Sequence, residues 1–467
     1  MLFDTSIFFV FLCLVVLGYW CLGFRNQNRF LLVASYFFYG WWDWRFLCLM
    51  IASTTIDYFI AIKVADTKDP RVRRSLLVLS LVINFSILGF FKYFNFFADS
   101  AVASLSAIGV HASMPLLRII LPPGISFYTF QEVAYIVDVY HERLPPSRSF
   151  VDYGLFITFF PHLIAGPIQR PSHLLPQVQN PRHWDSAKAF DGMMLILEGL
   201  FRKCVIADNC ALIANAAFGG SFRQLSLPVL LLGTYAFAWQ IYGDFSGYSN
   251  IARGCAQLMG FHFMVNFRQP YLADSIQDFW RRWHISLSTW LRDYLYIPLG
   301  GNRYGERNTY RNLLLTMLLG GLWHGANWTF VVWGALHGGG LAVERKLTRG
   351  VTTARAKLPR WAKRILIFHF VCLSWIFFRA ASLGAAWQML KGLKVWTWRP
   401  EFPAAFMFLA LFSVPLLLVD FYLESSGDEY CFASATLQPR VAFGLACALV
   451  IALFGANEAN AFIYFQF

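Results

Sequence analysis

Charged side chains are scarce in this sequence. They make up 14% of its 467 residues, against about a quarter in an ordinary soluble domain. The polar segments are short loops between apolar runs, and none is long enough to form a separate soluble domain. Both absences exclude a typical water-soluble globular protein.

Motifs of several enzyme classes are also absent. The nine cysteines are scattered without a CxxC pair, so they make neither a disulfide framework nor a zinc site. HExxH, GxSxG, a P-loop and a dinucleotide-binding fingerprint do not occur. We therefore expect no metal site and no bound cofactor, although a haem held by histidines stays an open alternative. Ser246 in "GDFSGYSN" lacks the nucleophile-elbow pattern, so a helix break that places Asp244 on a cavity is the preferred interpretation.

Long apolar runs dominate the chain instead, and hydrophobic residues make up 57% of it. A membrane-spanning helix needs about 20 apolar residues. We therefore predict an all-α, polytopic membrane protein with roughly ten to twelve spans, together with re-entrant or interfacial helices. The runs are Ile7–Gly23, Leu31–Ile62, Leu76–Phe91, Tyr153–Ile168, Met193–Phe201, Leu225–Tyr242, Leu313–Leu341, Ile365–Phe378, Phe406–Leu423 and Val441–Phe454.

The basic residues orient the chain in the membrane. The start, "MLFDTSIFFV", has no basic n-region and no cleavage site follows it, so we interpret it as a retained first span rather than a signal peptide. Arg25 and Arg29 follow the first span, and a second basic group, Lys63 to Arg74, follows the third. Because basic loops stay in the cytoplasm, we expect the N-terminus on the outer side.

The net charge of +13 does not indicate nucleic-acid binding, because the basic residues lie in short loops between spans. The densest of these loops is Glu344–Arg364. Membrane topology and contact with anionic membrane lipids explain such loops. Attraction of an anionic cytoplasmic substrate stays open as a second role.

The middle third, Phe160–Trp333, is where polar segments interrupt the apolar runs. Polar groups at membrane depth are tolerated only when they are buried in protein or line a cavity. Within this part, Gln277–Tyr296 predicts one amphipathic helix, which either anchors at the interface or re-enters the membrane. Its polar face consists of Arg281, His284, Ser288 and Arg292.

His324 lies inside a run without formal charge, Leu313–Leu341. An ionisable group inside a membrane span is a candidate functional residue, because burying it there is costly. The glycines around His324 let a substrate or another backbone come close. Burial should lower its pKa and leave a neutral base, although a hydrogen-bonded core histidine is the alternative from the residues alone. His337, about 220° further round one continuous helix, is interpreted as structural.

Several long motifs go further than composition. They are "LPPGISFYTFQEVAYIVDVY" (Leu121–Tyr140), Phe159–Pro171, Tyr242–Gly254, Asp278–Arg303, Arg311–Gly338 and the terminal "FIYFQF". These motifs resemble the membrane-bound O-acyltransferase family and, within it, the bacterial alginate O-acetylases. The resemblance runs along the whole chain, so it implies a single membrane domain, residues 1–467, around a central tunnel, with residues 277–341 as the catalytic core.

The family resemblance implies acyl transfer from a cytoplasmic thioester, most simply acetyl-CoA, to a hydroxyl group. His324 matches the histidine of the family's "WHG" motif and His284 that of its "RWH" motif, so both are expected to be catalytic. Arg303 is expected beside the arginines at the cytoplasmic opening. The residues expected to bind substrate or line the tunnel are Asn327, Trp323, Ser288, Arg281, Arg282, Arg292 and Asp244.

The resemblance also implies a location and partners. The expectation is a protein of the bacterial inner membrane that passes acetyl groups to periplasmic or membrane-anchored acetyltransferase subunits, which modify an exported polysaccharide of the alginate type. Cellulose or another exopolysaccharide is an alternative polymer. D-alanyl transfer to teichoic acids is an alternative within the family, and a polysaccharide or lipid-linked substrate transporter is the alternative from another class.

Overall fold

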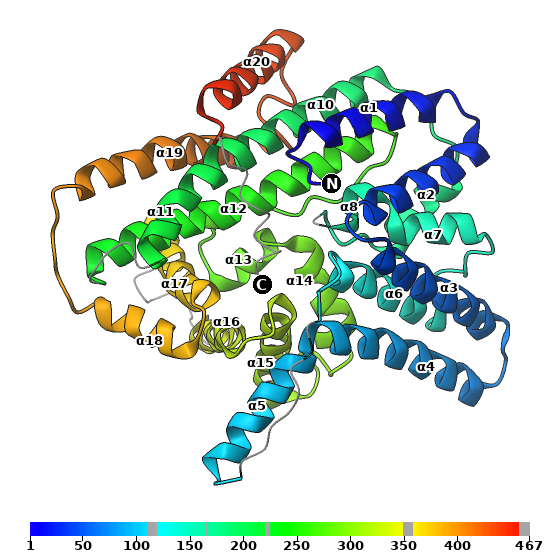
Figure 1. Ribbon diagram of the computed structural model, residues 1–467, viewed down its shortest axis with the longest axis horizontal. Coiled ribbons are helices and arrows are strands. Elements are labelled where there is room, and N and C mark those ends of the chain that lie inside the picture. The colour runs from blue at the N-terminus through cyan, green and yellow to red at the C-terminus, as the bar shows by residue number, and fades with distance from the viewer. Residues whose placement is uncertain (111–116, 118, 165, 220–224, 349–357, 457–467) are drawn as a thin grey trace. The chain divides into compact units, whose positions relative to one another are not determined.

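The computed structural model describes residues 1–110, 117, 119–164, 166–219, 225–348 and 358–456. Within these ranges all regular secondary structure is helical, with α-helices, short π and 3-10 segments and no strand (Figure 1). The all-α class expected from the sequence is confirmed. The terminal "FIYFQF" and residues 349–357 of the basic loop Glu344–Arg364 lie outside the described residues.

The first compact unit comprises Met1–Gly192 and Ala252–Met264. Within it, α3, α4 and α6 pack against one another, and a π-helical turn, Gly89–Tyr93, joins α4 to α5. The helices of this part are α1 (Ser6–Trp20), α2 (Phe24–Gly40), α3 (Trp44–Asp66), α4 (Pro70–Leu88), α5 (Phe94–Ala107), α6 (Ile125–Tyr140), α7 (Phe150–Thr158), α8 (Phe160–Leu163), α9 (Pro171–Gln179) and the start of α10 (Ser186–Leu200).

Helix starts in this unit follow from local side-chain chemistry. The Asp69 carboxylate accepts a hydrogen bond from Arg71 N at 2.8 Å, and Pro70 occupies the first position of α4. Ser149 caps α7 by accepting a hydrogen bond from Asp152 N at 3.3 Å. Such caps satisfy backbone N–H groups that have no partner inside the helix, and proline at the first position has no N–H to satisfy.

The second compact unit comprises Met193–Ile251 and Val265–Phe467. The whole segment 277–341, expected to form the catalytic core, lies in this unit; the single-domain organisation of the chain stays a prediction. The helices of this part are α11 (Asp208–Phe218), α12 (Leu227–Leu258), α13 (Ile276–Arg282), α14 (Ile285–Leu291), α15 (Gly305–His324), α16 (Trp328–Thr348), α17 (Arg360–Arg379), α18 (Leu383–Gly392), α19 (Phe402–Ser426) and α20 (Leu437–Phe454), with π turns at Phe201–Ala207 (η2) and Arg292–Tyr296 (η4) and a 3-10 turn at Pro270–Leu272 (η3).

Large aromatic side chains form the core of the second unit. Trp283, Trp333, Trp375 and Tyr242 are fully buried there, and Tyr271 is buried beside them. Trp333 and Trp375 are stacked, with ring centroids 5.9 Å apart. Rings of this size bury a large apolar area and restrict their neighbours to few positions, so this core fixes the helices on which the candidate site residues lie.

Five helical stretches of the described residues are long and apolar enough to cross a membrane. Four of them are single helices, and the fifth runs through α4, the π turn Gly89–Tyr93 (η1) and α5 as one stretch of 38 residues. The chain is therefore a multi-pass membrane protein, as expected, while the predicted number of spans stays a prediction. The stretches are Trp44–Asp66, Pro70–Ala107, Arg360–Arg379, Phe402–Ser426 and Leu437–Phe454.

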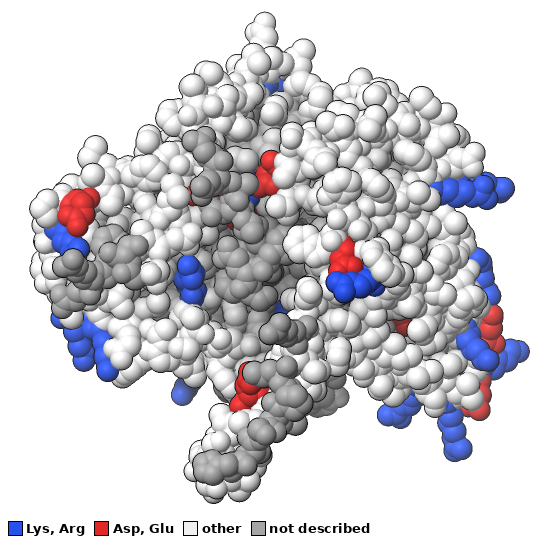
Figure 2. All heavy atoms as spheres, in the orientation of Figure 1, with Lys and Arg blue, Asp and Glu red and all other residues white. Residues whose placement is uncertain are grey.

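The surface agrees with a lipid environment. Apolar side chains such as Leu17, Met407 and Leu445 are exposed along the faces of their helices. Figure 2 shows one face of the molecule, on which Lys, Arg, Asp and Glu cover only small areas and most of the described surface is uncharged. Such apolar surface is unfavourable in water but not in hydrocarbon.

The stretch "GDFSGYSN" continues α12 without interruption. The helix break that we expected there is therefore wrong. A Cβ atom at Gly243 would lie 2.8 Å from Arg202 O, and one at Gly247 would lie 2.7 Å from Gly199 O. The small residues thus allow the backbone of residues 199–202 to approach α12 closely, rather than ending the helix.

Candidate functional site

His324 is the last residue of α15 and lies at the turn of a helical hairpin formed with α16. The run Leu313–Leu341 therefore forms two helices. The angle of about 220° between His324 and His337 assumed one continuous helix and is wrong. Asn327 starts α16: its Oδ1 accepts a hydrogen bond from Thr329 N at 3.0 Å. The same residue fixes the turn from the other side, because its Nδ2 donates to Ala381 O at 3.0 Å.

Glycines let the two helices of this hairpin touch. A Cβ atom at Gly321 would collide with Phe330 O, and one at Gly334 would collide with Met317 O. Gly325 lies against the ring of Phe330 in the same way. The sequence predicts that these glycines let either a substrate or another backbone come close. The structure shows the close approach of another backbone.

Aromatic rings surround the imidazole of His324, which is only 3% exposed. The ring centroids of Trp323, Trp333 and Phe378 lie 5.1, 5.1 and 5.3 Å from that of His324. Trp323, one of the expected tunnel residues, also contacts His284, with centroids 6.0 Å apart. The rings exclude water from the imidazole and fix its orientation.

His284 interrupts the helix expected over Gln277–Tyr296. That expectation of one continuous helix is wrong, because α13 ends at Arg282 and α14 begins at Ile285. His284 between them is in the left-handed conformation, with φ 44° and ψ 53°. A non-glycine residue adopts this conformation only when its surroundings determine it.

The surroundings that determine it come from the extended segment before η3. Ile285 N donates to Asn266 O at 2.9 Å, and Arg268 N donates to Arg282 O at 2.9 Å. These two backbone hydrogen bonds hold the chain on both sides of His284. Periodicity within residues 277–296 contains no signal of them, because both partners lie earlier in the sequence.

The two histidines lie close together in the second unit. Their ring centroids are 6.4 Å apart, with the ring planes at 59°. His284 is fully buried, in the link between two seven-residue helices that are too short to cross a membrane. Burial lowers its pKa to about 3, because desolvation disfavours the charged form. The imidazole of His284 is therefore neutral at physiological pH.

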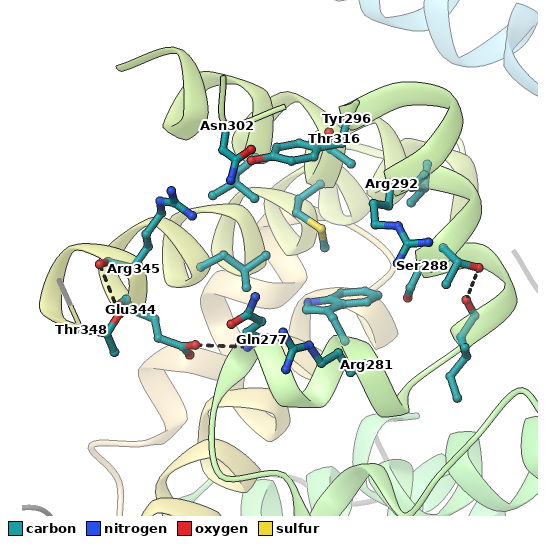
Figure 3. A pocket seen from close by; sticks show the side chains of 17 residues that line it. Gln277, Arg281, Ser288, Arg292, Tyr296, Asn302, Thr316, Glu344, Arg345 and Thr348 are labelled. Atoms are coloured by element: carbon teal, nitrogen blue, oxygen red, sulfur yellow. Dashed lines mark hydrogen bonds between the residues drawn. The ribbon is translucent and has the colours of Figure 1, made fainter. Parts of the chain in front are cut away.

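The same unit contains a cavity of about 780 Å³ (Figure 3), and neither histidine is among its lining residues. Ile285, the residue after His284, forms part of its wall, and α13, α14, η4, α15 and α16 all contribute to the lining. Two expected arginines, Arg281 and Arg292, lie in the wall together with Arg345. The labelled polar residues are Gln277, Arg281, Ser288, Arg292, Tyr296, Asn302, Thr316, Glu344, Arg345 and Thr348.

Three of the residues expected at the tunnel line this cavity, each in a defined way. Ser288 donates to Trp283 O at 3.0 Å, which ties the start of α14 to the bend before it. Arg292 is exposed and forms an ion pair with Asp293 at 2.7 Å. Hydrogen bonding to that carboxylate raises the pKa of Arg292, so it is positively charged at any relevant pH. Arg281 is exposed at the cavity wall.

Arg282 does not line the cavity. It forms ion pairs with Asp278 at 2.9 Å and with Glu424 at 2.6 Å. Burial alone would lower the pKa of Arg282, but the hydrogen bonds to Glu424 and Asp278 outweigh it and raise the pKa. Arg303 is exposed and does not line the cavity either. The structure thus separates two adjacent arginines, one at the cavity and one in an ion-pair network.

Asp244 lies apart from the cavity. It is buried in α12 and forms an ion pair with Lys203 at 2.9 Å. Lys203 also contacts Asp208 at 2.9 Å, so one ammonium group is shared between two carboxylates. Removing one member of such a buried pair leaves an uncompensated charge and is strongly destabilising.

His337 has hydrogen-bond partners on both ring nitrogens. Trp280 Nε1 donates to its Nδ1 at 3.3 Å, so Nε2 carries the proton and donates to Ser374 Oγ at 3.0 Å. The Ser374 hydroxyl in turn donates to Val371 O at 2.7 Å. This geometry supports the structural role expected for His337, because both nitrogens are used to hold α16 against its neighbours.

Some residues of the site have no recognisable signal in the sequence. Asn266, which contacts His284, lies in one of the polar segments of the middle third, but no motif there marks it as a site residue. Glu344 accepts hydrogen bonds from the first backbone N–H groups of α13, Ile276 N at 2.6 Å and Gln277 N at 3.4 Å. The sequence marks Arg345 only as one residue of the basic loop Glu344–Arg364. Among the described residues, no group of three or more His, Cys, Asp or Glu is arranged to hold a metal ion.

The sequence model of the membrane-bound O-acyltransferase family matches residues 140–387, which include both histidines and the cavity. The chain is 45% identical over 392 residues to the probable alginate O-acetylase AlgI of Pseudomonas putida, covering 83% of this chain and 79% of the relative. It is 39% identical over 425 residues to the peptidoglycan O-acetyltransferase of Helicobacter pylori, covering 84% and 80%.

A more distant relative shares only part of the chain. The teichoic acid D-alanyltransferase of Streptococcus thermophilus is 29% identical over 297 residues, which cover 57% of this chain and 70% of the relative. The similarity thus extends beyond acetyl transfer, and the identity to the AlgI and peptidoglycan relatives named above is higher than the identity to this D-alanyltransferase. The chain belongs to the membrane-bound O-acyltransferase family and is an O-acyltransferase.

Proposed function

We propose that this protein transfers acetyl groups from a cytoplasmic thioester across the membrane for O-acetylation of an exported polysaccharide. The observation that supports it most is the pair of buried imidazoles, His284 and His324, in the same unit as a cavity that has arginines in its wall and Ile285, the residue after His284, in its lining. An alginate-type polymer is the first candidate, because relatives with that name share 45% identity with this chain. Peptidoglycan is the second candidate, on the 39% identity to a peptidoglycan O-acetyltransferase.

In this proposal His324 is the general base. Its ring takes the proton of the acceptor hydroxyl as the oxygen forms a bond to the acetyl carbon and the carbon–sulfur bond of the thioester breaks. The proton then passes to the departing thiolate, which leaves as a thiol. His324 is the last residue of α15, and the negative end of a helix dipole stabilises the imidazolium that forms by about 0.3–1 kcal/mol.

The cavity is the proposed site of the donor, most simply acetyl-CoA. Its volume of about 780 Å³ is within the range of roughly 300–1,000 Å³ that ligand pockets occupy. Arg281 and Arg292 would bind the phosphates through paired N–H groups. Ser288 would line the path from this cavity to His284, and Trp323 would shape the reaction chamber between the histidines.

The remaining residues would act through structure. Asn327 would hold the turn after His324, and Asp244 would keep α12 in place through Lys203. Arg282 would hold α13 against α19 through Glu424.

The setting that fits this chemistry is the bacterial inner membrane, with the N-terminus in the periplasm and the donor on the cytoplasmic side. Periplasmic or membrane-anchored acetyltransferase subunits would receive the acetyl group and complete its transfer to the polymer. D-alanyl transfer is the less supported alternative, because the identity to the D-alanyltransferase is 29% over 57% of the chain. A transporter remains the alternative from another class, and it predicts no dependence on a thioester donor.

The test is His324→Ala, with the exposed loop residue His141 changed to alanine as the matched control. The first change should abolish the acetyl esters of the exported polymer while the amount of protein in the membrane fraction stays normal; the second should alter neither. Acetyl content and membrane protein level are measured in the same cultures. Normal acetylation in His324→Ala would contradict the assignment of the base, and acetyl transfer without acetyl-CoA would contradict the proposed donor.

A further inference from the structure

Asn266 is the centre of a buried polar cluster around His284. Asn266, Ser286 and Ser249 are each at most 1% exposed, and His284 is fully buried. The chain places an amide, two hydroxyls and an imidazole together among aromatic rings. Buried polar groups are hydrogen-bonded in native proteins, so the hydrogen-bond pattern of this cluster determines what each group can do.

The orientation of the Asn266 amide follows from its neighbours. Its Oδ1 accepts hydrogen bonds from Ser286 N at 3.2 Å and from Ser286 Oγ at 2.9 Å. A backbone N–H can only donate, so the atom that faces it must be the amide oxygen. The amide nitrogen points the other way and donates to Ser249 Oγ at 3.2 Å. A flipped amide would place two N–H groups against each other.

This orientation decides which nitrogen of His284 has the proton. His284 Nδ1 lies 3.3 Å from the same Asn266 Oδ1. Because an amide oxygen only accepts hydrogen bonds, Nδ1 must be the protonated nitrogen. In a neutral imidazole the other nitrogen, Nε2, is then the acceptor.

Asn266 also holds the backbone of His284. Its carbonyl oxygen accepts the hydrogen bond from Ile285 N at 2.9 Å, next to the residue with φ 44°. A left-handed residue costs about 1–2 kcal/mol, so the ring would turn away from His324 if this support were lost. One residue thus sets both the direction and the protonated nitrogen of the ring.

We infer that Asn266 is a positioning residue that holds His284 as the Nδ1–H tautomer and so makes its Nε2 a hydrogen-bond acceptor in the reaction. The inference rests on the proposed function. While neutral, His284 can then hold an N–H or O–H group, such as the acceptor hydroxyl or an N–H of His324, and it cannot serve as a donor to a developing oxyanion.

The side chains that face the His284 ring determine which charges can shift its titration. His324, on α15, is a titratable group in contact with the ring. The described ring contacts also include three uncharged side chains: Phe245 on α12 at 4.6 Å, Phe267 at 6.3 Å and Trp323 at 6.0 Å between centroids. A change of charge at position 266 should therefore act on His284 first, and through it on His324.

Three variants separate positioning from packing. Asn266→Ala removes the acceptor, and kcat should fall on the order of 10²-fold, the lower range of acid–base contributions, with the KM for acetyl-CoA unchanged. Asn266→Asp keeps an acceptor for Nδ1–H but adds a negative charge, which favours the imidazolium, so the acidic limb of the kcat–pH profile should move to higher pH. Ser249→Ala removes only the partner of the amide nitrogen and leaves the acceptor of Nδ1–H in place, so kcat should fall less than in Asn266→Ala and the pH profile should match that of the wild type.

A merely structural Asn266 would lower the membrane protein level and leave the pH profile in place, and that result would overturn the inference. So would a normal kcat in Asn266→Ala. Histidine ¹⁵N NMR of the wild-type protein, with the His284 signal assigned by its loss in His284→Gln, tests the tautomer without any activity. An Nδ1–H signal supports the inference even if acetyl transfer fails, whereas an Nε2–H signal contradicts it even if acetyl transfer is confirmed.

Discussion

Replacing Arg281 and Arg292 together by lysine should raise the KM for acetyl-CoA about 30-fold and leave kcat nearly unchanged. Lysine keeps the charge but replaces the planar fork with a single ammonium group. Hydrogen bonds to charged groups are worth about 1.5–3 kcal/mol, and the lower end suits an open cavity. One lost bond of about 1.5 kcal/mol at Arg281 raises KM by a factor of slightly more than about ten. At Arg292 a factor of about three is expected, because its side chain is 60% exposed and already pairs with Asp293.

The adjacent Arg282 is the matched control. Arg282→Lys removes a guanidinium from the same helix, but its partners are Asp278 and Glu424 rather than the cavity. All these variants keep the charge count that determines membrane topology. The KM in Arg282→Lys should therefore stay at the wild-type value, and its effect should appear as a lower unfolding temperature.

Initial rates of the purified protein in lipid nanodiscs, measured at varied acetyl-CoA concentration, give KM and kcat for each variant. Higher ionic strength should raise the wild-type KM, because salt screens charges in an open cavity. A KM within twofold of the wild type in the double lysine variant would refute phosphate recognition by these two arginines. The next candidate for the donor phosphates would then be Arg345, the other arginine in the wall of this cavity.

Three further predictions concern the histidines and the hairpin. His284→Ala should reduce acetyl transfer severely but not completely, and a double-mutant cycle with His324→Ala on kcat decides whether the two act together, since multiplicative losses would mean separate roles. Gly334→Ala should destabilise the hairpin by about 1–3 kcal/mol, because its Cβ meets Met317 O, whereas Gly339→Ala, with nothing within 4 Å, should be neutral in the same thermal unfolding assay. Because the pKa of His284 is lowered to about 3 in the folded protein and is about 6.5 unfolded, the unfolded state binds more protons below pH 6.5. The contribution of His284 to the free energy of unfolding should then fall by up to about 2 kcal/mol between pH 6.5 and pH 5, and His284→Gln should make the total decrease smaller by that amount.

Much of the architecture could be predicted from local patterns. Apolar runs gave the helical membrane class, and the stretch Leu313–Leu341 contained the signals of its own turn. Gly325 ends one helix and Asn327 starts the next, both with residue types typical of such positions. We did not predict this turn, because the stretch has no charged residue and hydrophobicity alone does not distinguish one long helix from two packed helices.

The bend at His284 could not be predicted locally. Its unusual backbone conformation depends on hydrogen bonds to Asn266 O and Oδ1, and no periodicity within residues 277–296 reveals a partner outside them. The helix pattern of that stretch is strong, and tertiary contacts override it.

The sequence predicts only part of the difference between Arg281 and Arg282. Asp278 stands four residues before Arg282, which is a recognisable helical ion pair. Glu424 lies 142 residues later, and only the fold brings it to α13. The sequence therefore predicted a basic cluster, but not which of its members faces the cavity.

The stretch Pro70–Ala107 sets a condition on how the protein lies in a bilayer. Its 38 residues measure about 57 Å at 1.5 Å per residue, against a hydrocarbon thickness of about 30 Å. Even a tilt of 40°, the upper end for such helices, leaves about 44 Å along the membrane normal. The excess must leave the hydrocarbon or bend at the π turn Gly89–Tyr93. The end of α5 should therefore lie outside the hydrocarbon layer. A spin label at that end should sample water or headgroups, whereas a label in the middle of α4 should sample acyl chains.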